Sequence, residues 1–217
     1  MLNWVEIDAA ALSGNVAEFR RRLGPGPLLG AVVKSNAYGH GMLETASVVR
    51  AAGADWLCVN SVDEGVRLRE AGHDAPVLVM GYVPLDALEE AVVHDLRPVV
   101  YNLETVDRLE RIASARGRRV RVHLKAETGT NRQGVPEPEI PALVRRIRGS
   151  SSLDLEGLTT HFANIEDTTD HGFAESQISA FSRIFDAVVA EGGPAPIRHS
   201  ACSAATLLFN RTHLELA

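Results

Sequence analysis

The feature of this sequence that most constrains its fold is an alternation of short apolar, β-branched runs with longer amphipathic stretches. This alternation is typical of βα units, which lay down a parallel sheet. The apolar runs predict seven strands, over Leu29–Val33, Trp56–Val59, Val77–Met80, Pro98–Tyr101, Val120–Lys125, Leu155–His161 and Ile197–Ala201.

Helix-spaced apolar residues fill the stretches between these runs, and an opening helix is expected near Ala9–Leu23. The later helices are predicted over Leu43–Ala52, Val62–Ala71, Asp86–His94, Glu104–Arg116 and Glu175–Glu191. Glycines stand where helix C-caps belong, at Gly53, Gly72, Gly117 and Gly192.

Successive parallel strands with right-handed crossovers form either an open doubly wound sheet or a closed barrel, which needs eight strands. Seven strands fit within the 217 residues, and the segment Thr206–Ala217 runs from a short helical stretch toward another strand. Breaker-rich connections occur at residues 24–27 and 136–141, but no shift in composition marks a domain linker. We therefore expect one domain over residues 1–217, truncated before a further strand.

Composition limits the function classes. A hydrophobic content of 45% supports one sizeable core, and a net charge of -6 argues against binding to nucleic acid or an anionic membrane. The two cysteines, Cys58 and Cys202, lack metal-type spacing. Neither a signal peptide nor a long apolar run is present. We expect a cytoplasmic protein that acts on a small molecule.

The first predicted strand delivers Lys34 to its end, beside the small loop Ser35–Gly41. Loops that follow parallel strands collect at one edge of the sheet, where ligands bind. On position alone Lys34 could be a solvated lysine that caps a strand. The functional alternative is an amine that forms an imine with an aldehyde, since desolvation or neighbouring positive charge lowers a lysine pKa from about 10.4.

The segment Val33-Lys34-Ser-Asn-Ala-Tyr38-Gly39-His40-Gly41 resembles the lysine segment of alanine racemases, which are pyridoxal-phosphate enzymes with a barrel domain. The resemblance covers essentially the whole chain and implies a (β/α)8-type barrel, here incomplete with about seven strands. It also implies that Lys34 forms the internal aldimine with pyridoxal 5'-phosphate and serves as one of two racemising bases, while Tyr38 reaches the cofactor phosphate.

A second polar strand end runs from Lys125 to Arg132 and could be a turn with surface charges. It resembles the family's lysine-to-arginine stretch, which implies that Arg132 bonds the cofactor's phenolic oxygen. Lys125, often a carbamate in that family, would orient the arginine. The stretch differs from the family's commonest sequence at two places. Glu127 stands where the family has aspartate, and residues 130–131 stand where it has methionine and glycine.

The last two predicted strands end in His161 and in the run His199-Ser-Ala-Cys202-Ser203. His161 could be a structural histidine, and the resemblance implies that it stacks on the pyridine ring. Ser203 could be a helix N-cap. The resemblance implies that Ser203 is instead a phosphate ligand, with His199 as a supporting residue. Cys202 stands where the family has asparagine.

The same residues are compatible with two other classes of protein. One is a barrel hydrolase whose metal ions are bridged by a carbamylated lysine, and its candidate metal ligands would be His123, Lys125, His161 and His199. Such a site also needs a His-x-His pair on an early strand and an aspartate ligand on a late strand, and the sequence has neither. The other rival is a non-catalytic pyridoxal-phosphate-binding barrel or inactive fragment.

The resemblance implies that the protein acts as a homodimer and interconverts L- and D-alanine. This reaction supplies D-alanine for peptidoglycan. The family's opposite base is a tyrosine in a C-terminal β-domain, and an arginine facing the pyridine nitrogen follows the point where this chain stops; neither has a match in this chain.

Overall fold

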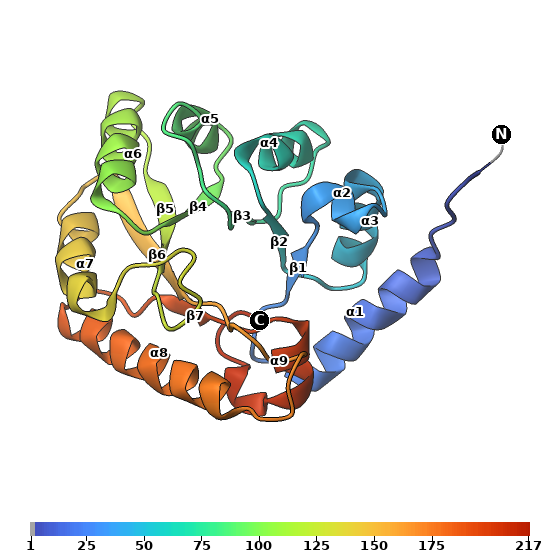
Figure 1. Cartoon of the computed structure of the whole chain (residues 1–217). Helices are drawn as coiled ribbons and strands as arrows, with labels where there is room; N and C mark the ends of the chain where they lie inside the picture. Colours follow the sequence, from blue (N-terminus) through green and yellow to red (C-terminus); the bar gives the residue numbers. More distant parts are fainter. Residues whose placement is uncertain (1–2) are drawn as a thin grey trace.

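The computed structural model describes residues 3–217, and within them seven parallel strands form one sheet in the order β1 to β7 (Figure 1). Each strand pairs with its neighbour along the chain, as successive right-handed βα units require. The strands are β1 (Gly30–Val32), β2 (Trp56–Val59), β3 (Val77–Val79), β4 (Arg97–Val100), β5 (Val120–Lys125), β6 (Leu153–Thr159) and β7 (Ile197–His199).

The helices lie outside the strands and surround them (Figure 1). They are α1 (Ala9–Leu23), α2 (Lys34–Tyr38), α3 (Met42–Ala51), α4 (Val62–Glu70), α5 (Leu88–Val93), α6 (Leu103–Ala115), α7 (Ile140–Arg148), α8 (Gly172–Ala190) and α9 (Ser203–Leu208), with 3-10 turns at Glu137–Glu139 and Asn210–Thr212.

The last described residues join the two edge strands. Leu28, just before β1, bridges Leu216 in parallel, and Gly30 N–H donates to the Ala217 carbonyl at 2.7 Å. On the other side, Leu216 N–H donates to the Arg198 carbonyl of β7 at 3.2 Å. The sheet therefore curves round until β7 approaches β1, which is the geometry of a barrel. The predicted barrel fold is confirmed.

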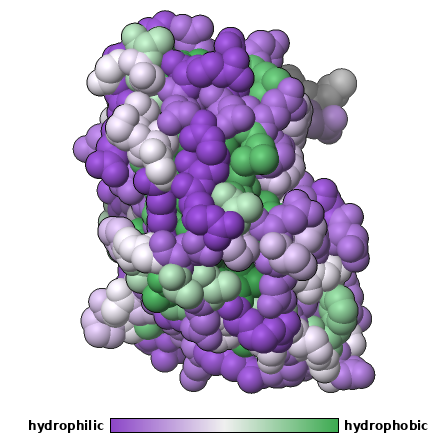
Figure 2. All heavy atoms as spheres, turned by 90° about the vertical axis from the view of Figure 1, so that its left-hand side faces the viewer, coloured by the Kyte–Doolittle hydropathy of each residue, from purple (hydrophilic) through white to green (hydrophobic). Residues whose placement is uncertain are grey.

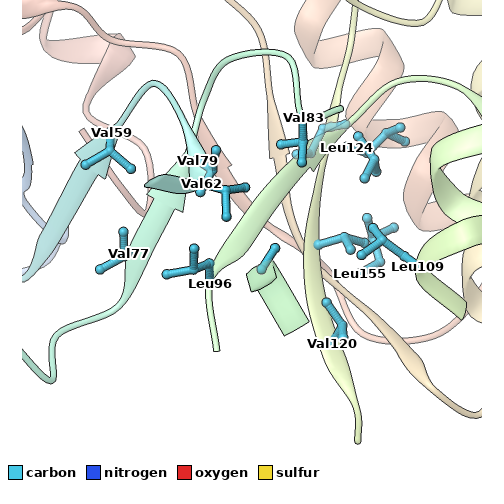
Figure 3. Packing of buried hydrophobic residues seen from close by; sticks show 14 of the residues in the cluster. Val59, Val62, Val77, Val79, Val83, Leu96, Leu109, Val120, Leu124 and Leu155 are labelled. Carbon is cyan, nitrogen blue, oxygen red and sulfur yellow. The ribbon is translucent and has the colours of Figure 1, made fainter. Parts of the chain in front are cut away.

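Two apolar regions stabilise this arrangement. The larger lies between the strands and the helices, where side chains such as Val79, Leu109 and Leu124 are fully buried (Figure 3). The smaller lies inside the barrel, where alternate residues of the strands point, and includes Trp56, Cys58, Leu78, Val99 and Leu216. Alternation along each strand fills both regions, as barrel geometry requires.

All seven predicted strands are confirmed, with ends that differ by at most a few residues. Two helices were not predicted. The first is α2, where a loop was expected. The second is α7, which follows a proline-rich segment that was expected to interrupt regular structure. Pro141 is the second residue of α7, where a missing N–H costs no helical hydrogen bond. The buried residues of α7 repeat at helical spacing behind it, at Ile140, Leu143, Val144 and Ile147.

The face of the molecule that carries α6 to α8 is mostly hydrophilic, with smaller hydrophobic patches among the hydrophilic residues (Figure 2). Within residues 3–217, none of the helices combines the length and apolar character that crossing a membrane requires.

Candidate active site

Lys34 lies at the carboxyl end of β1, where the chain enters α2. The α2 segment is a turn of left-handed helix: residues 35–38 all have φ between 52° and 55°, and none of them is glycine. A left-handed conformation costs about 1–2 kcal/mol per L-residue, so four in a row persist only where the surroundings hold them. The turn projects Lys34 as a half-buried side chain and leaves Tyr38 62% exposed.

Contacts within the segment hold part of this turn. Ala37, which is buried, donates its N–H to the Val33 carbonyl at 2.9 Å. Asn36 suits the left-handed region better than most residues, and its Oδ1 accepts from the Met42 N–H at 3.0 Å. The amine of Lys34 therefore extends from a backbone that is tied to the start of α3.

The loop after β5 folds back over the buried Lys125. Glu127 N–H donates to the Val135 carbonyl at 3.0 Å, and Val135 N–H donates to the Lys125 carbonyl at 2.8 Å. Gly134, with φ 144°, makes this possible, since a Cβ there would lie 2.6 Å from the Glu127 nitrogen. The fold-back returns Arg132 toward the strand end that carries Lys125.

A side-chain bridge closes the same region. Gln133 Oε1 accepts from Lys125 Nζ at 3.3 Å, and Gln133 Nε2 donates to the Tyr101 hydroxyl at 3.3 Å. Tyr101 follows β4, so the bridge connects two neighbouring strand ends. Neither Gln133 nor Tyr101 was predicted as a site residue, although both stand at strand or loop ends where ligand-binding residues gather.

Glu127 organises the substituted loop. Its carboxylate accepts from the Gly129 N–H at 2.5 Å and from the Thr130 hydroxyl at 3.2 Å. Partial burial raises the pKa of Glu127, but hydrogen bonds from the backbone of Gly129 and Asn131 outweigh it and the pKa lies below its ordinary value. The carboxylate is therefore ionised at neutral pH and engaged within its own loop.

Positive charge converges on the barrel mouth. Loss of water lowers the pKa of Lys125, and the charges of Arg132 and Lys34 lower it further. The pKa of His161 is lowered for the same reasons, first by burial and then by Lys125, Arg132 and Lys34. Among residues 3–217, no ion pair includes Lys34, Lys125 or Arg132. The sequence contains only two lysines, and both serve this region.

A buried hydrogen-bond chain, which we call the lumen relay, lies beneath the mouth inside the barrel. His123 Nε2 is 3.2 Å from Glu156 Oε2, and His123 Nδ1 is 2.7 Å from His199 Nε2. The carboxylate can only accept, so His123 donates from Nε2 and accepts at Nδ1 from His199. Burial lowers the pKa of His123 and of His199, which keeps both rings neutral.

Gly157 makes room for the lumen relay. A Cβ on Gly157 would lie 2.1 Å from His123 Nδ1, so any side chain there would displace the ring. The His123 ring also meets Trp56 edge-on, with ring centroids 5.4 Å apart. His199 was predicted as a supporting residue and, in the metal-hydrolase alternative, was grouped with His123; their direct hydrogen bond and the part played by Glu156 were not predicted.

Ser203 is the first residue of α9 and is exposed. The interpretation of Ser203 as a helix N-cap is wrong, because the N-cap is Cys202 and no side chain caps this helix. The hydroxyl of Ser203 therefore stands beside backbone N–H groups that no side chain satisfies.

The metal-site hypothesis gains no support from this arrangement. Two of its four residues, His123 and His199, bond to each other in the lumen relay. In the described part of the chain, no three His, Cys, Asp or Glu side chains come together in a way that could hold a metal ion.

A parallel barrel whose mouth holds two lysines, an arginine and a neutral histidine can bind an anion beside an amine. The fold and the site thus define a class of α/β barrels that place a lysine and a cationic pocket at the carboxyl ends of their strands.

Comparison with known proteins identifies the family within that class. The chain belongs to the alanine racemase family, since the family model "Alanine racemase, N-terminal domain" matches residues 7–217. It is 36% identical over 214 residues to an alanine racemase of Methanococcus maripaludis, and 39% identical over 222 residues to one of Desulfosudis oleivorans. Each alignment covers 98% of this chain and 57% of the relative.

Solved structures agree with the sequence relatives. The alanine racemase of Streptomyces coelicolor matches with a TM-score of 0.92 and 34% identity, over 97% of this chain and 57% of that chain. The chain thus spans a little over half the length of the proteins that it resembles.

Proposed function

We propose that this chain is the cofactor-binding barrel of an alanine racemase and that Lys34 is both its cofactor-linking amine and one of its two bases. The observation that carries the proposal is the unpaired cationic mouth around Lys34, Lys125 and Arg132, in a chain of this family. These groups suit pyridoxal 5'-phosphate, which offers an aldehyde to an amine and carries anionic phenolate and phosphate oxygens.

When bound, the cofactor would supply the electron-withdrawing conjugation that acidifies the α-proton of an amino acid. The chain's own residues would do the rest. Lys34, which directly precedes the left-handed turn, would hold or return a proton at the α-carbon from one face. Inversion needs a second base on the opposite face, and we propose that this base comes from outside the described residues, across a homodimer.

The remaining site residues would bind and orient. Arg132 would donate to the phenolic oxygen, and Tyr38 and Ser203 would donate their hydroxyl groups to phosphate. His161, whose lowered pKa keeps it neutral, would pack against the pyridine ring without adding charge.

Lys125 has a separate task in this proposal. Its lowered pKa enlarges the neutral fraction of the amine, which is the form that reacts with carbon dioxide to give a carbamate. A carbamate there would give Arg132 an anionic partner with two oxygens, and would orient the guanidinium.

Reconstitution tests the proposal. The purified chain, Lys34→Ala and Lys125→Ala are mixed with pyridoxal phosphate, and the visible absorption band of bound cofactor is recorded. We expect the band in the wild type, its loss in Lys34→Ala and a weaker but present band in Lys125→Ala. A band of unchanged intensity in Lys34→Ala would refute the assignment.

A circular-dichroism assay then separates the racemase from a non-catalytic carrier. Inversion of L-alanine by the reconstituted chain, or by the chain mixed with the C-terminal domain of a full-length alanine racemase, supports the racemase. Cofactor binding with no inversion under either condition supports the carrier.

A further inference from the structure

One carboxylate connects the lysine turn to the next strand. Glu64, the third residue of α4, accepts from the Ser35 N–H through Oε1 at 2.5 Å. Its other oxygen, Oε2, accepts from the Asn60 N–H at 2.7 Å and from the Ser61 N–H at 3.3 Å. Both oxygens are thus used, one at the end of β1 and the other at the end of β2.

The contact with Ser35 falls where the backbone most needs support. Ser35 is the first of the four left-handed residues, at φ 53° and ψ 50°, and directly follows Lys34. Of the contacts described above, the Asn36 side chain holds the later part of the turn, and the bond from Ala37 to Val33 is a backbone bond that closes the turn as a whole. Glu64 is the side chain that holds its beginning.

Glu64 also serves α4, and the two tasks can be separated. Ser61 and Glu64 form a capping box, in which Ser61 Oγ accepts from the Glu64 N–H at 3.4 Å. A helix cap needs the Ser61 hydroxyl and the Glu64 oxygen that faces Ser61. It makes no use of the other oxygen, which crosses to Ser35.

We propose that Glu64 is a positioning residue for Lys34: its carboxylate, shared between N–H groups at the ends of β1 and β2, holds the left-handed turn from which Lys34 and Tyr38 extend. The consequence for cofactor binding rests on the proposed function; the hold on the turn does not. A carboxylate is required because it can accept at both oxygens, whereas an amide of the same shape would turn an NH₂ group toward one set of N–H donors.

Amide hydrogen exchange tests the hold on the turn without any cofactor. The full chain is compared with Glu64→Gln and with Ser61→Ala, which removes the other half of the capping box and spares the Ser35 contact. The reporting amides are Ala37, Gly39 and His40, which donate within the turn. Amides of β5 report global unfolding and normalise the three proteins.

We expect exchange in the turn to be about 10- to 100-fold faster in Glu64→Gln, the size of effect that loss of a charged hydrogen-bond acceptor produces. In Ser61→Ala it should stay within about threefold of the wild type. Equal exchange in the turn for Glu64→Gln and the wild type, or equal acceleration in both variants, would overturn the proposal.

Titration with pyridoxal phosphate, followed by visible absorbance, then tests the effect on Lys34. We expect Glu64→Gln to bind the cofactor at least about tenfold more weakly than Ser61→Ala, with a shifted band. A loosened turn with wild-type affinity and spectrum would overturn the positioning role. A wild type that gives no band at all would refute the proposed function instead, and the exchange result would still decide whether Glu64 holds the turn.

Discussion

Gly157→Ala gives the sharpest test of how the lumen relay is packed. The added methyl carbon would lie 2.1 Å from His123 Nδ1, 2.5 Å from Cε1 and 2.6 Å from Cγ, whereas ordinary contacts begin near 3.4 Å. The ring must move by more than about 1 Å to relieve this overlap. It has no free space, because His123 is fully buried between Trp56 and His199.

The expected cost has two parts. Overpacking a filled core costs about 1–3 kcal/mol. Displacing His123 also breaks its 2.7 Å hydrogen bond to His199 and leaves buried polar atoms unsatisfied, for about 1–3 kcal/mol more. We therefore expect Gly157→Ala to lower the free energy of unfolding by about 2–6 kcal/mol.

Urea unfolding followed by far-UV circular dichroism measures this loss by linear extrapolation. The double mutant with His123→Ala is the control, because removal of the ring makes room for the methyl group and should recover most of the overpacking cost. A Gly157→Ala protein within about 0.5 kcal/mol of the wild type, or a full cost that persists without the ring, would refute this account of the lumen relay.

Three smaller predictions concern stability. Gly14→Ala, at an exposed helical site with no atom within 4 Å of the new methyl group, should raise the free energy of unfolding by about 0.5–1 kcal/mol; a loss would contradict the open environment. Asp8→Ala removes the N-cap side chain of α1, which accepts hydrogen bonds from two N–H groups, and should lower the free energy of unfolding by about 1 kcal/mol. Asp8→Asn is the control, because asparagine is also a good N-cap and should keep most of that stability. Acid should destabilise the fold below pH 6.5, because buried His123 and His199 have lowered pKa values, so the unfolded chain binds more protons there. Urea titrations at pH 7.5, 6 and 5 should show that the free energy of unfolding falls as the pH falls, and His199→Gln should make this pH dependence weaker. If the pH dependence is the same in His199→Gln and the wild type, His199 does not titrate as proposed.

Much of the fold was predictable because its signals are local. Apolar runs of β-branched residues marked every strand, and parallel strand ends necessarily share one edge of the sheet. For this reason the sequence alone predicts that Lys34, Lys125 and His161 meet, since they lie at the ends of β1 and β5 and just beyond β6.

The unpredicted features depend on conformation or on long-range pairing. Residues 35–38 contain no glycine, the usual sign of a left-handed backbone, so only Asn36 hinted at the turn. His123 and His199 are 76 residues apart. Their strand positions suggested a shared metal site, but nothing in the sequence indicated that the two rings bond directly to each other. Gly157 did carry a usable signal, because a glycine inside a strand often marks a close approach.

The most direct test of the central claim is to find where pyridoxal phosphate attaches. The chain is loaded with the cofactor, reduced with borohydride and digested, and mass spectrometry locates the added phosphopyridoxyl group among the two lysines and the amino terminus. The account predicts modification of Lys34, with little on Lys125. Attachment mainly at Lys125, or at both lysines to the same extent, would contradict it.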